Sequence, residues 1–215
     1  MIPLLHDFEG ETVLVFGGGN VGARKARRFA REAHVVVVSP DFADTDFGDA
    51  DLVRAAPDPE NVVEWVERTD PALVVAATDV EAVNDAAERV AGEQDILLNR
   101  ADEHGERDPG SVVVPATVRD DPVTVAVATG GRSPALSRYL REEIEAEFPG
   151  VGEMAELTGA LRTELQEMGV PPAKRRAAVR AVVRSSDVWK ALDTGSANSR
   201  QVAVDVIEDV TGETL

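Results

Sequence analysis

The chain has 215 residues and no cysteine, so disulfides, thiolate metal sites and cysteine nucleophiles are excluded. Its formal net charge of −18 at pH 7 argues against nucleic acids and anionic membranes as partners. No apolar run reaches membrane-spanning length, and no basic segment followed by an apolar one opens the chain, so we expect a cytoplasmic protein without an export signal.

The first predicted element is a buried strand over residues 12–16, which breaks into Gly17-x-Gly19-x-x-Gly22 and continues with helical spacing. A strand, a glycine turn and a helix start in this order are typical of a dinucleotide site. Gly17 permits the tight turn, Gly19 lets the backbone approach a pyrophosphate, and Gly22 lets the helix lie close to the strand. Free N–H groups at the helix start then bind the phosphates. The alternative is a glycine turn in some other α/β protein.

Strands and helices alternate along the next part of the chain. We predict strands over residues 34–39, 52–54, 72–77 and 96–99, and helices over 60–69 and 80–91. Four consecutive valines in the first of these strands suit a parallel sheet that is covered on both faces. The alternation predicts an α/β, Rossmann-like, doubly wound sheet with right-handed crossovers.

The pattern changes near residues 108–110. It predicts strands over 111–118 and 123–129 joined by a turn, a helix over 133–147 that Ser133 caps, and further helices over 152–168, 173–192 and 199–210. We therefore divide the chain into a nucleotide-binding domain over 1–110, a strand pair with a helix over 111–149, and a helical domain over 150–215. The part after the sheet has too few apolar residues to fold alone, so we expect it to pack on the sheet or on a second subunit.

The cofactor's ribose is expected at the end of the second strand, where NAD sites usually carry an acid. Here the chain reads Ser39-Pro40-Asp41, so the acid comes two residues late. We assign Pro40 and Asp41 to the cofactor site; either Asp41 reaches the ribose or Ser39 and backbone groups replace it. Asp41 as a plain loop residue is the alternative. An acid without an arginine directly after the strand predicts NAD rather than NADP.

Two further strands end at the same carboxyl edge, where ligands bind in open sheets. Thr78 follows one of them, and it either faces the cofactor or, with Asp79, caps the next helix. Asp102 follows the other, where a carboxylate can accept a proton while the cofactor takes a hydride. A loop aspartate in an acid-rich chain is the alternative for Asp102. Farther along, a glycine pair at 130–131 opens a helix that bears Arg132, which is another natural cradle for anions.

Four blocks of this sequence, in order, resemble the siroheme-synthase family, and more exactly its precorrin-2 dehydrogenase module. They are residues 15–26, residues 76–84, Asn99-x-x-Asp102, and the segment 131–142 that begins Gly131-x-Ser133-Pro134. The resemblance covers residues 1 to about 145 well and the helical remainder loosely. We expect this chain to lack the methyltransferase domain of the longer members.

The resemblance implies NAD-dependent oxidation of precorrin-2 to sirohydrochlorin by a homodimer, built through the dimerisation region 111–149. In many members it also implies insertion of ferrous iron, here only as a substrate, to give siroheme. It carries the family's key aspartate over to Asp102. The cofactor residues it implies are Gly17, Gly19, Asn20, Val21 and Gly22. The substrate residues we assign are Thr129, Gly131, Arg132, Ser133 and Arg138, although Ala128-Thr129 departs from the family's serine-rich strand end.

Precorrin-2 is a polycarboxylate, so local arginines must overcome the repulsion from an acidic chain. The candidates are Arg100, Arg107, Arg132, Arg138 and Arg141. The basic segment 174–190 either walls the pocket or forms a solvated face that pairs with a neighbour's acids. We expect no fixed metal site, because no cluster of His, Asp and Glu has ligand spacing; His104 is structural or assists near Asp102.

The alternative from another class is a non-catalytic nucleotide sensor, such as the regulatory domain of a channel or transporter. A sensor also carries a glycine turn but needs neither Asn99-x-x-Asp102 nor Gly131-x-Ser133-Pro134. A dehydrogenase of a generic small substrate is the third interpretation. The acidity itself we attribute to adaptation to a salt-rich cytoplasm, where screening relieves self-repulsion.

Overall fold

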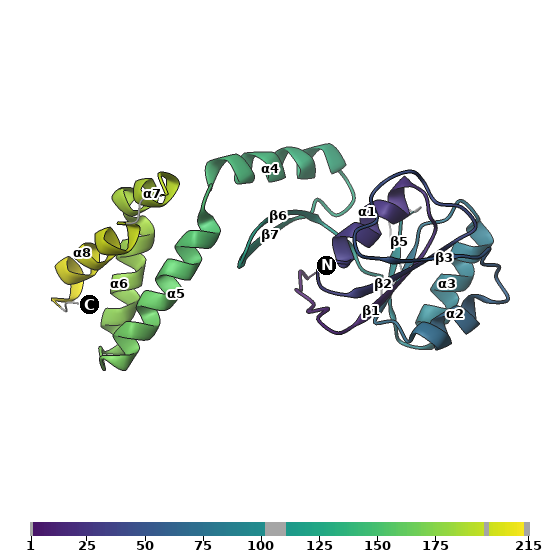
Figure 1. Ribbon diagram of the computed structural model, residues 1–215, viewed down its shortest axis with the longest axis horizontal. Coiled ribbons are helices and arrows are strands. Elements are labelled where there is room, and N and C mark those ends of the chain that lie inside the picture. Colours follow the sequence, from purple (N-terminus) through teal and green to yellow (C-terminus); the bar gives the residue numbers. More distant parts are fainter. Residues whose placement is uncertain (1, 102–110, 196–197, 213–215) are drawn as a thin grey trace. The chain divides into compact units, whose positions relative to one another are not determined.

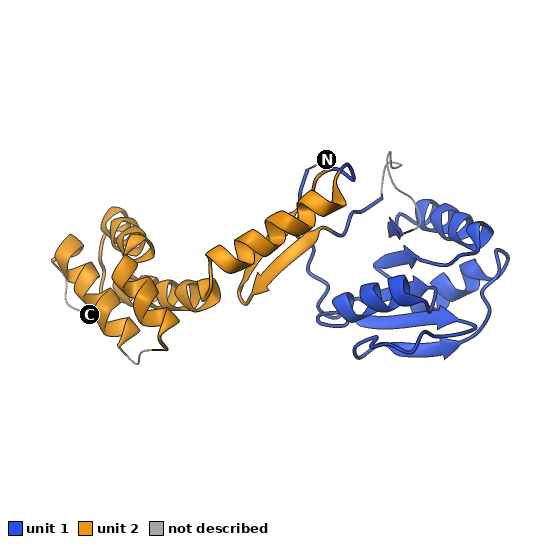
Figure 2. Cartoon of the chain, turned by 90° about the horizontal axis from the view of Figure 1, so that it is seen from above, with its two compact units in different colours: residues 1–114, 130–132 blue, residues 115–129, 133–215 orange. Residues whose placement is uncertain are grey.

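The computed structural model describes residues 2–101, 111–195 and 198–212. The chain divides into two compact units (Figure 2). Unit 1 comprises residues 1–114 with 130–132, and unit 2 comprises residues 115–129 with 133–215. Each unit has a hydrophobic core of its own.

Unit 1 (Figure 1) is built on a five-stranded parallel sheet. The hydrogen-bonded strand order is β3-β2-β1-β4-β5. From β1 the chain moves outward first on one side and then on the other, so the strand order reverses between β1 and β4. In such a sheet the crevice for ligands opens at the carboxyl ends of these two strands. The strands are β1 (Thr12–Phe16), β2 (His34–Ser39), β3 (Asp51–Arg54), β4 (Leu73–Ala76) and β5 (Leu97–Arg100), and the helices are α1 (Asn20–Phe29), α2 (Val62–Thr69) and α3 (Glu81–Glu93).

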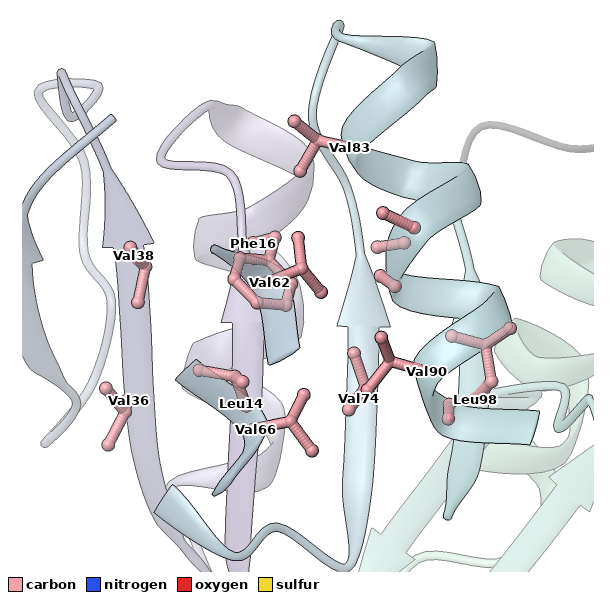
Figure 3. Packing of buried hydrophobic residues seen from close by; sticks show 14 residues of the cluster. Leu14, Phe16, Val36, Val38, Val62, Val66, Val74, Val83, Val90 and Leu98 are labelled. Carbon is pink, nitrogen blue, oxygen red and sulfur yellow. The ribbon is translucent and has the colours of Figure 1, made fainter. Parts of the chain in front are cut away.

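The sheet is covered on both faces, as the valine run of β2 predicts. Val36 and Val38 point into the core made with α2 and α3 (Figure 3). Val35 and Val37 point into the second core, which contains buried alanines of α1. Because successive side chains of a strand alternate between faces, a strand buried on both faces has to be apolar throughout.

After β5 the chain returns to the sheet at Ser111, which bridges to Leu98 in parallel orientation. The backbone N–H of Val112 donates to the carbonyl of Leu98 at 2.7 Å. The strand predicted over 111–118 is therefore wrong in its first half. Pro115 lacks an N–H to donate, which fits a ladder that begins only at the next residue. The hairpin in unit 2 consists of β6 (Ala116–Asp120) and β7 (Val123–Val127), which pair antiparallel.

Unit 2 continues with helices only, and four of them share a core. Leu161, Leu165, Val182 and Ile207 are among its fully buried residues. This corrects the expectation that the part after the sheet lacks enough apolar side chains for a core, although that expectation still describes α4, which has no buried residue. The helices are α4 (Pro134–Glu147), α5 (Val151–Glu167), α6 (Pro172–Arg184), α7 (Ser186–Asp193) and α8 (Ser199–Thr211).

The single helix predicted over 173–192 is wrong, because the chain breaks at Ser185. This residue has an extended ψ of 115°, and its Oγ accepts from the backbone N–H of Val188 at 3.4 Å. Ser185 thus caps α7 instead of continuing α6. No helix in the described part of the chain has the length and apolar character needed to cross a bilayer.

Candidate functional site

Only glycine can fill three positions of the turn between β1 and α1; two of them lie against β4 and the turn itself, and the third, Gly18, faces the loop after β2. Gly17 has a φ of 118°, and a Cβ there would lie 2.3 Å from the carbonyl oxygen of Ala77. A Cβ on Gly22 would lie 1.9 Å from the carbonyl oxygen of Gly17. Both contacts are with backbone, which cannot move aside without displacing β4 or the turn. These glycines therefore bring α1 close to the carboxyl ends of β1 and β4.

Gly19 plays a different part, because a Cβ added to it would meet nothing within 4 Å. Gly19 is exposed and directly precedes α1. Asn20 and Val21, the first two residues of that helix, are exposed as well. The first helical hydrogen bond runs from the N–H of Ala23 to the carbonyl of Gly19, so the N–H groups of residues 20–22 have no partner within the helix. The first turn of α1 contains no acid, although the chain has 40. The open space and these N–H groups fit the pyrophosphate of a dinucleotide.

The loop after β2 packs directly on this turn. The N–H of Ala43 donates to the carbonyl of Gly18 at 2.8 Å, and a Cβ on Gly18 would lie 2.2 Å from the carbonyl oxygen of Asp41. The hydroxyl of Ser39 donates to that same carbonyl at 2.7 Å, so its hydrogen is already used within the loop. The carboxylate of Asp41, by contrast, is exposed beside the glycine turn. Asp41 is therefore the better placed of the two predicted ribose ligands.

Sequence reasoning missed Arg54 at this place. Its Nη1 donates to the carbonyl of Pro40 at 2.8 Å and to Oδ1 of Asp41 at 3.0 Å. Arg54 ends β3, where it pairs in register with Ser39, although it lies thirteen positions after Asp41 in the sequence. Only the pairing of β2 with β3 brings them together, and the only sequence signal is that Arg54 is a rare cation in an acid-rich segment.

Thr78 lies beside the glycine turn, since its N atom would be 3.0 Å from a Cβ on Gly17. Its hydroxyl oxygen accepts from the N–H of Val80 at 2.9 Å, and its carbonyl accepts from Nδ2 of the fully buried Asn84 at 3.0 Å. These bonds hold the turn between β4 and α3. The N-cap of α3 is Val80 and has no side-chain cap, so the predicted cap by Thr78 and Asp79 is wrong, and a contact of Thr78 with the cofactor stays a prediction.

The predicted catalytic residue Asp102 lies outside the described residues, as do His104 and Arg107. The end of β5, which precedes Asp102 in the chain, is described. Asn99 is 2% exposed, and its Nδ2 donates to the carbonyl of Val112 at 2.7 Å, which joins β5 to the returning chain. Within the described residues, Oδ1 of Asn99 is buried without a hydrogen-bond partner.

Arg100 does not have the role expected of it. Its side chain is 4% exposed, and its Nη1 lies 3.0 Å from Oδ1 of Asp85 and 2.7 Å from Oε2 of Glu88. The two acids of α3 therefore already neutralise this guanidinium inside unit 1. The prediction that Arg100 attracts carboxylates of a substrate is not supported.

The second predicted constellation precedes α4. Gly130 and Gly131 both have left-handed backbones, with φ of 62° and 77°, which explains the glycine pair. The hydroxyl oxygen of Thr129 accepts from the N–H of Ser133 at 3.2 Å, and Oγ of Ser133 accepts from the N–H of Leu136 at 3.3 Å. Ser133 is thus the N-cap of α4, as predicted, and Thr129 steadies the same turn.

The arginines predicted to bind the substrate differ in whether an acid of the described chain already pairs with them. Arg138 donates from Nε to Oε1 of Glu142 at 2.9 Å, and this hydrogen bond, with the nearby positive charges, lowers the pKa of Glu142. Arg141 pairs with Glu142 and Glu145. Arg132 is exposed and forms no ion pair with any described residue. Arg132 is therefore the cation of this set that is best able to receive a carboxylate.

Two predicted features remain, the basic segment and the absence of a metal site. In the basic segment, Arg176, Arg180 and Arg184 are exposed along α6, and Nζ of Lys174 donates to the carbonyl of Thr211 at 3.2 Å. The described residues contain no group of three or more His, Asp and Glu side chains that is able to hold a metal ion.

Comparisons with known proteins cover both units. A family model described as NAD(P)-binding matches residues 4–116, and the model of the central region of sirohaem biosynthesis proteins matches residues 120–147. A precorrin-2 dehydrogenase of Methanosarcina barkeri is 30% identical over 200 residues, which cover 87% of this chain and 85% of that protein. Siroheme synthase 3 of Aeromonas hydrophila is 30% identical over 220 residues, which cover 97% of this chain and 44% of that protein. The chain thus spans less than half the length of that siroheme synthase.

A solved structure has the same fold. The structure described as SirC, precorrin-2 dehydrogenase, superposes with a TM-score of 0.69 at 20% sequence identity. The alignment covers 97% of this chain and 100% of that one. The likeness extends over the α/β sheet and the helices that follow it, so it supports the fold of this chain.

Proposed function

The chain belongs to the family of precorrin-2 dehydrogenases and siroheme synthases, and from this premise we propose that it oxidises precorrin-2 to sirohydrochlorin with NAD as the cofactor. The observation that carries the proposal is the likeness to a precorrin-2 dehydrogenase along most of both chains. The open glycine turn agrees with it, since this reaction needs a dinucleotide. The same likeness favours an enzyme over a nucleotide sensor. We place the reaction in the cytoplasm.

The residues of unit 1 hold the cofactor. Gly17 and Gly22 shape the turn, Gly19 leaves room for the pyrophosphate, and the N–H groups of residues 20–22 bind its oxygens. The carboxylate of Asp41 accepts hydrogen bonds from the ribose hydroxyls. When bound, the nicotinamide supplies the hydride acceptor for the reduced tetrapyrrole.

Asp102 accepts the proton that the substrate loses during the oxidation. Its proposed role rests on its position two residues after β5, whose carboxyl end is adjacent to that of β4. Asn99 and the ion-paired Arg100 fix the direction in which the chain leaves the sheet. Such positioning matters because a general base works only within hydrogen-bond reach of its proton.

The substrate's carboxylates are received at the amino end of α4. Arg132, which forms no ion pair with a described residue, offers its guanidinium there. Thr129, Gly131 and Ser133 shape this turn, and Arg138 follows one turn later on the helix. If this chain also inserts ferrous iron into sirohydrochlorin, we propose that the iron enters as a second substrate and not as a resident metal.

A second copy of this chain covers the apolar face of α4. Leu136, Tyr139, Leu140 and Phe148 recur at helical spacing and are 37–55% exposed. Beside them, a hollow of about 240 Å³ lies between the hairpin and the carboxyl end of the helix, lined mainly by valines. A contiguous apolar face of this kind is typical of a subunit interface. The homodimer is thus proposed to form through the hairpin and α4.

The decisive experiment is an anaerobic assay with precorrin-2 and NAD, in which NADH formation is followed by absorbance. We expect turnover by the native chain and a loss of about 10²–10⁴-fold in Asp102→Ala, with NAD affinity retained. Asp49→Ala, which removes a different acid of unit 1, one that is exposed, is the control and keeps full activity.

Each outcome of the assay has a distinct meaning. Native-like turnover of Asp102→Ala removes the assignment of that residue. A native chain that binds NAD but leaves precorrin-2 unchanged contradicts the dehydrogenase and supports the sensor. Adding ferrous iron and watching for the siroheme spectrum tests metal insertion separately.

A further inference from the structure

Arg54 is held against the loop after β2 by three contacts. Its Nη1 donates to the carbonyl of Pro40 at 2.8 Å and to Oδ1 of Asp41 at 3.0 Å. Its guanidinium carbon lies 5.6 Å from the centre of the Phe42 ring. The parallel pairing of Ser39 with Arg54 delivers this side chain to the loop, so its position is a property of the sheet.

The same loop is fixed to the glycine turn. The hydrogen bond from Ala43 to Gly18, and the lack of space for a Cβ on Gly18, set the loop's distance from the turn. In doubly wound sheets the adenosine ribose lies between the glycine turn and the end of the second strand. Asp41 and Arg54 thus lie where the 2′ position of the adenosine ribose is expected, which carries a hydroxyl in NAD and a phosphate in NADP.

The two side chains have opposite preferences at this point. A carboxylate accepts hydrogen bonds from the ribose hydroxyls and repels a 2′-phosphate, whereas a guanidinium is the side chain that accommodates a 2′-phosphate. Their ion pair adds little to folding, since the side chains of Arg54 and Asp41 are 67% and 92% exposed. We therefore expect this ion pair to affect ligand binding and not stability.

We propose that Arg54 makes the choice of cofactor depend on Asp41. In the native chain the carboxylate neutralises the guanidinium and is itself steadied for the ribose hydroxyls of NAD. Once the carboxylate is gone, Arg54 becomes a ligand for the 2′-phosphate of NADP. This inference rests on the proposed dinucleotide site. The sequence has no arginine directly after β2, but the pairing of β3 with β2 brings Arg54 to that place.

The test is a double-mutant cycle with calorimetric titration of NAD and NADP into the full chain. The native chain binds NAD more tightly than NADP. Asp41→Asn, which keeps the size of the side chain, weakens NAD binding about tenfold and strengthens NADP binding about tenfold, as expected for charge-assisted hydrogen bonds. Arg54→Gln leaves NADP binding weak, and the double variant loses the gain that Asp41→Asn produced.

A matched control separates position from net charge. Arg68 is an exposed arginine of the same acid-rich segment, but it lies over the Trp65 ring in the last turn of α2. Asp41→Asn combined with Arg68→Gln keeps the full gain in NADP affinity. If this control loses the gain, or if the double variant with Arg54→Gln keeps it, the proposal is overturned.

Two further results distinguish this proposal from the proposed function. A failure of Asp41→Asn to gain any NADP affinity, with NAD still bound by the native chain, overturns the role of Arg54 alone. A native chain that binds neither dinucleotide contradicts the cofactor site itself. Unchanged circular dichroism of the variants shows that these exposed substitutions leave the fold intact.

Discussion

At the scale of single residues, the glycines of the first turn divide into two kinds. Gly17, Gly18 and Gly22 are required by the fold, because a Cβ on any of them would meet backbone. Gly19 faces open space, so the fold itself does not require a glycine there. A glycine that packing does not need, at the exposed start of a helix, points to a ligand that approaches the backbone.

We predict that Gly19→Val folds with native stability but no longer binds NAD, because the side chain fills the space of the pyrophosphate. Gly22→Ala, in contrast, loses about 1–3 kcal/mol of unfolding free energy through overpacking. Gly92→Ala in α3, where a Cβ meets nothing, is the control and gains about 0.5–1 kcal/mol. Urea unfolding and calorimetric titration measure both effects, and intact NAD affinity in Gly19→Val would refute the assignment of this turn.

A second prediction at this scale concerns pH. The hydrogen bond from Arg138 is the main cause of the lowered pKa of Glu142. Because the pKa is lower in the folded chain, this pair stabilises the fold above the ordinary pKa of glutamate, and the contribution is lost as the pH falls through the lowered value. Arg138→Gln should raise the Glu142 midpoint in an NMR titration. Arg132→Gln, which removes a cation with no described contact to Glu142, should leave it unchanged.

At the scale of elements, α4 is distinguished by its lack of any buried residue. The described chain leaves its apolar stripe uncovered, whereas α5 to α8 bury theirs against one another. A helix normally gains its stability by packing an apolar face. The stripe therefore calls for a partner, which the proposed second copy supplies.

We predict that Tyr139→Asp together with Leu140→Asp converts a dimer into a monomer, because two carboxylates would be buried without partners. Light scattering after gel filtration measures the mass, with 22.9 kDa expected for one chain. Val183→Asp places an acid at another exposed apolar position, on α6, and should leave the dimer intact. A native chain that elutes with the mass of one copy contradicts the interface.

The elements also show what the sequence can and cannot predict. Buried strands such as β2 are found easily, because four valines in succession fit only a strand covered on both faces. The break at Ser185 is missed because apolar spacing continues across it, and a serine is common both within helices and at their caps. The part played by Arg54 is missed because it depends on the register of two strands, which no local pattern contains.

At the scale of the whole molecule, the dominant property is the formal charge of −18. Among the described residues, most of the exposed ion pairs are local, and surface pairs of this kind contribute little to stability. The repulsion among the remaining acids is long-ranged, and salt shortens its range from about 10 Å at 0.1 M to about 3 Å at 1 M. The folded chain therefore gains more from salt than the more extended unfolded chain does.

We predict that the melting temperature rises by several degrees between 0.1 M and 2 M potassium chloride. The physical reason is screening, so most of the rise should be complete once the screening length is shorter than the spacing of the charges. Sucrose at matched osmolality is the control, since it stabilises proteins without screening. A melting temperature that does not respond to salt would count against an adaptation to saline surroundings.

The acid-free amino end of α1 gives salt an opposite effect on the cofactor. Its exposed N–H groups attract any small anion, and chloride is one. We therefore expect chloride at molar concentration to compete with the dinucleotide and to raise the dinucleotide concentration needed for half-saturation. Salt thus stabilises the folded chain but weakens dinucleotide binding. We expect the salt concentration of highest activity to lie below the salt concentration of highest melting temperature.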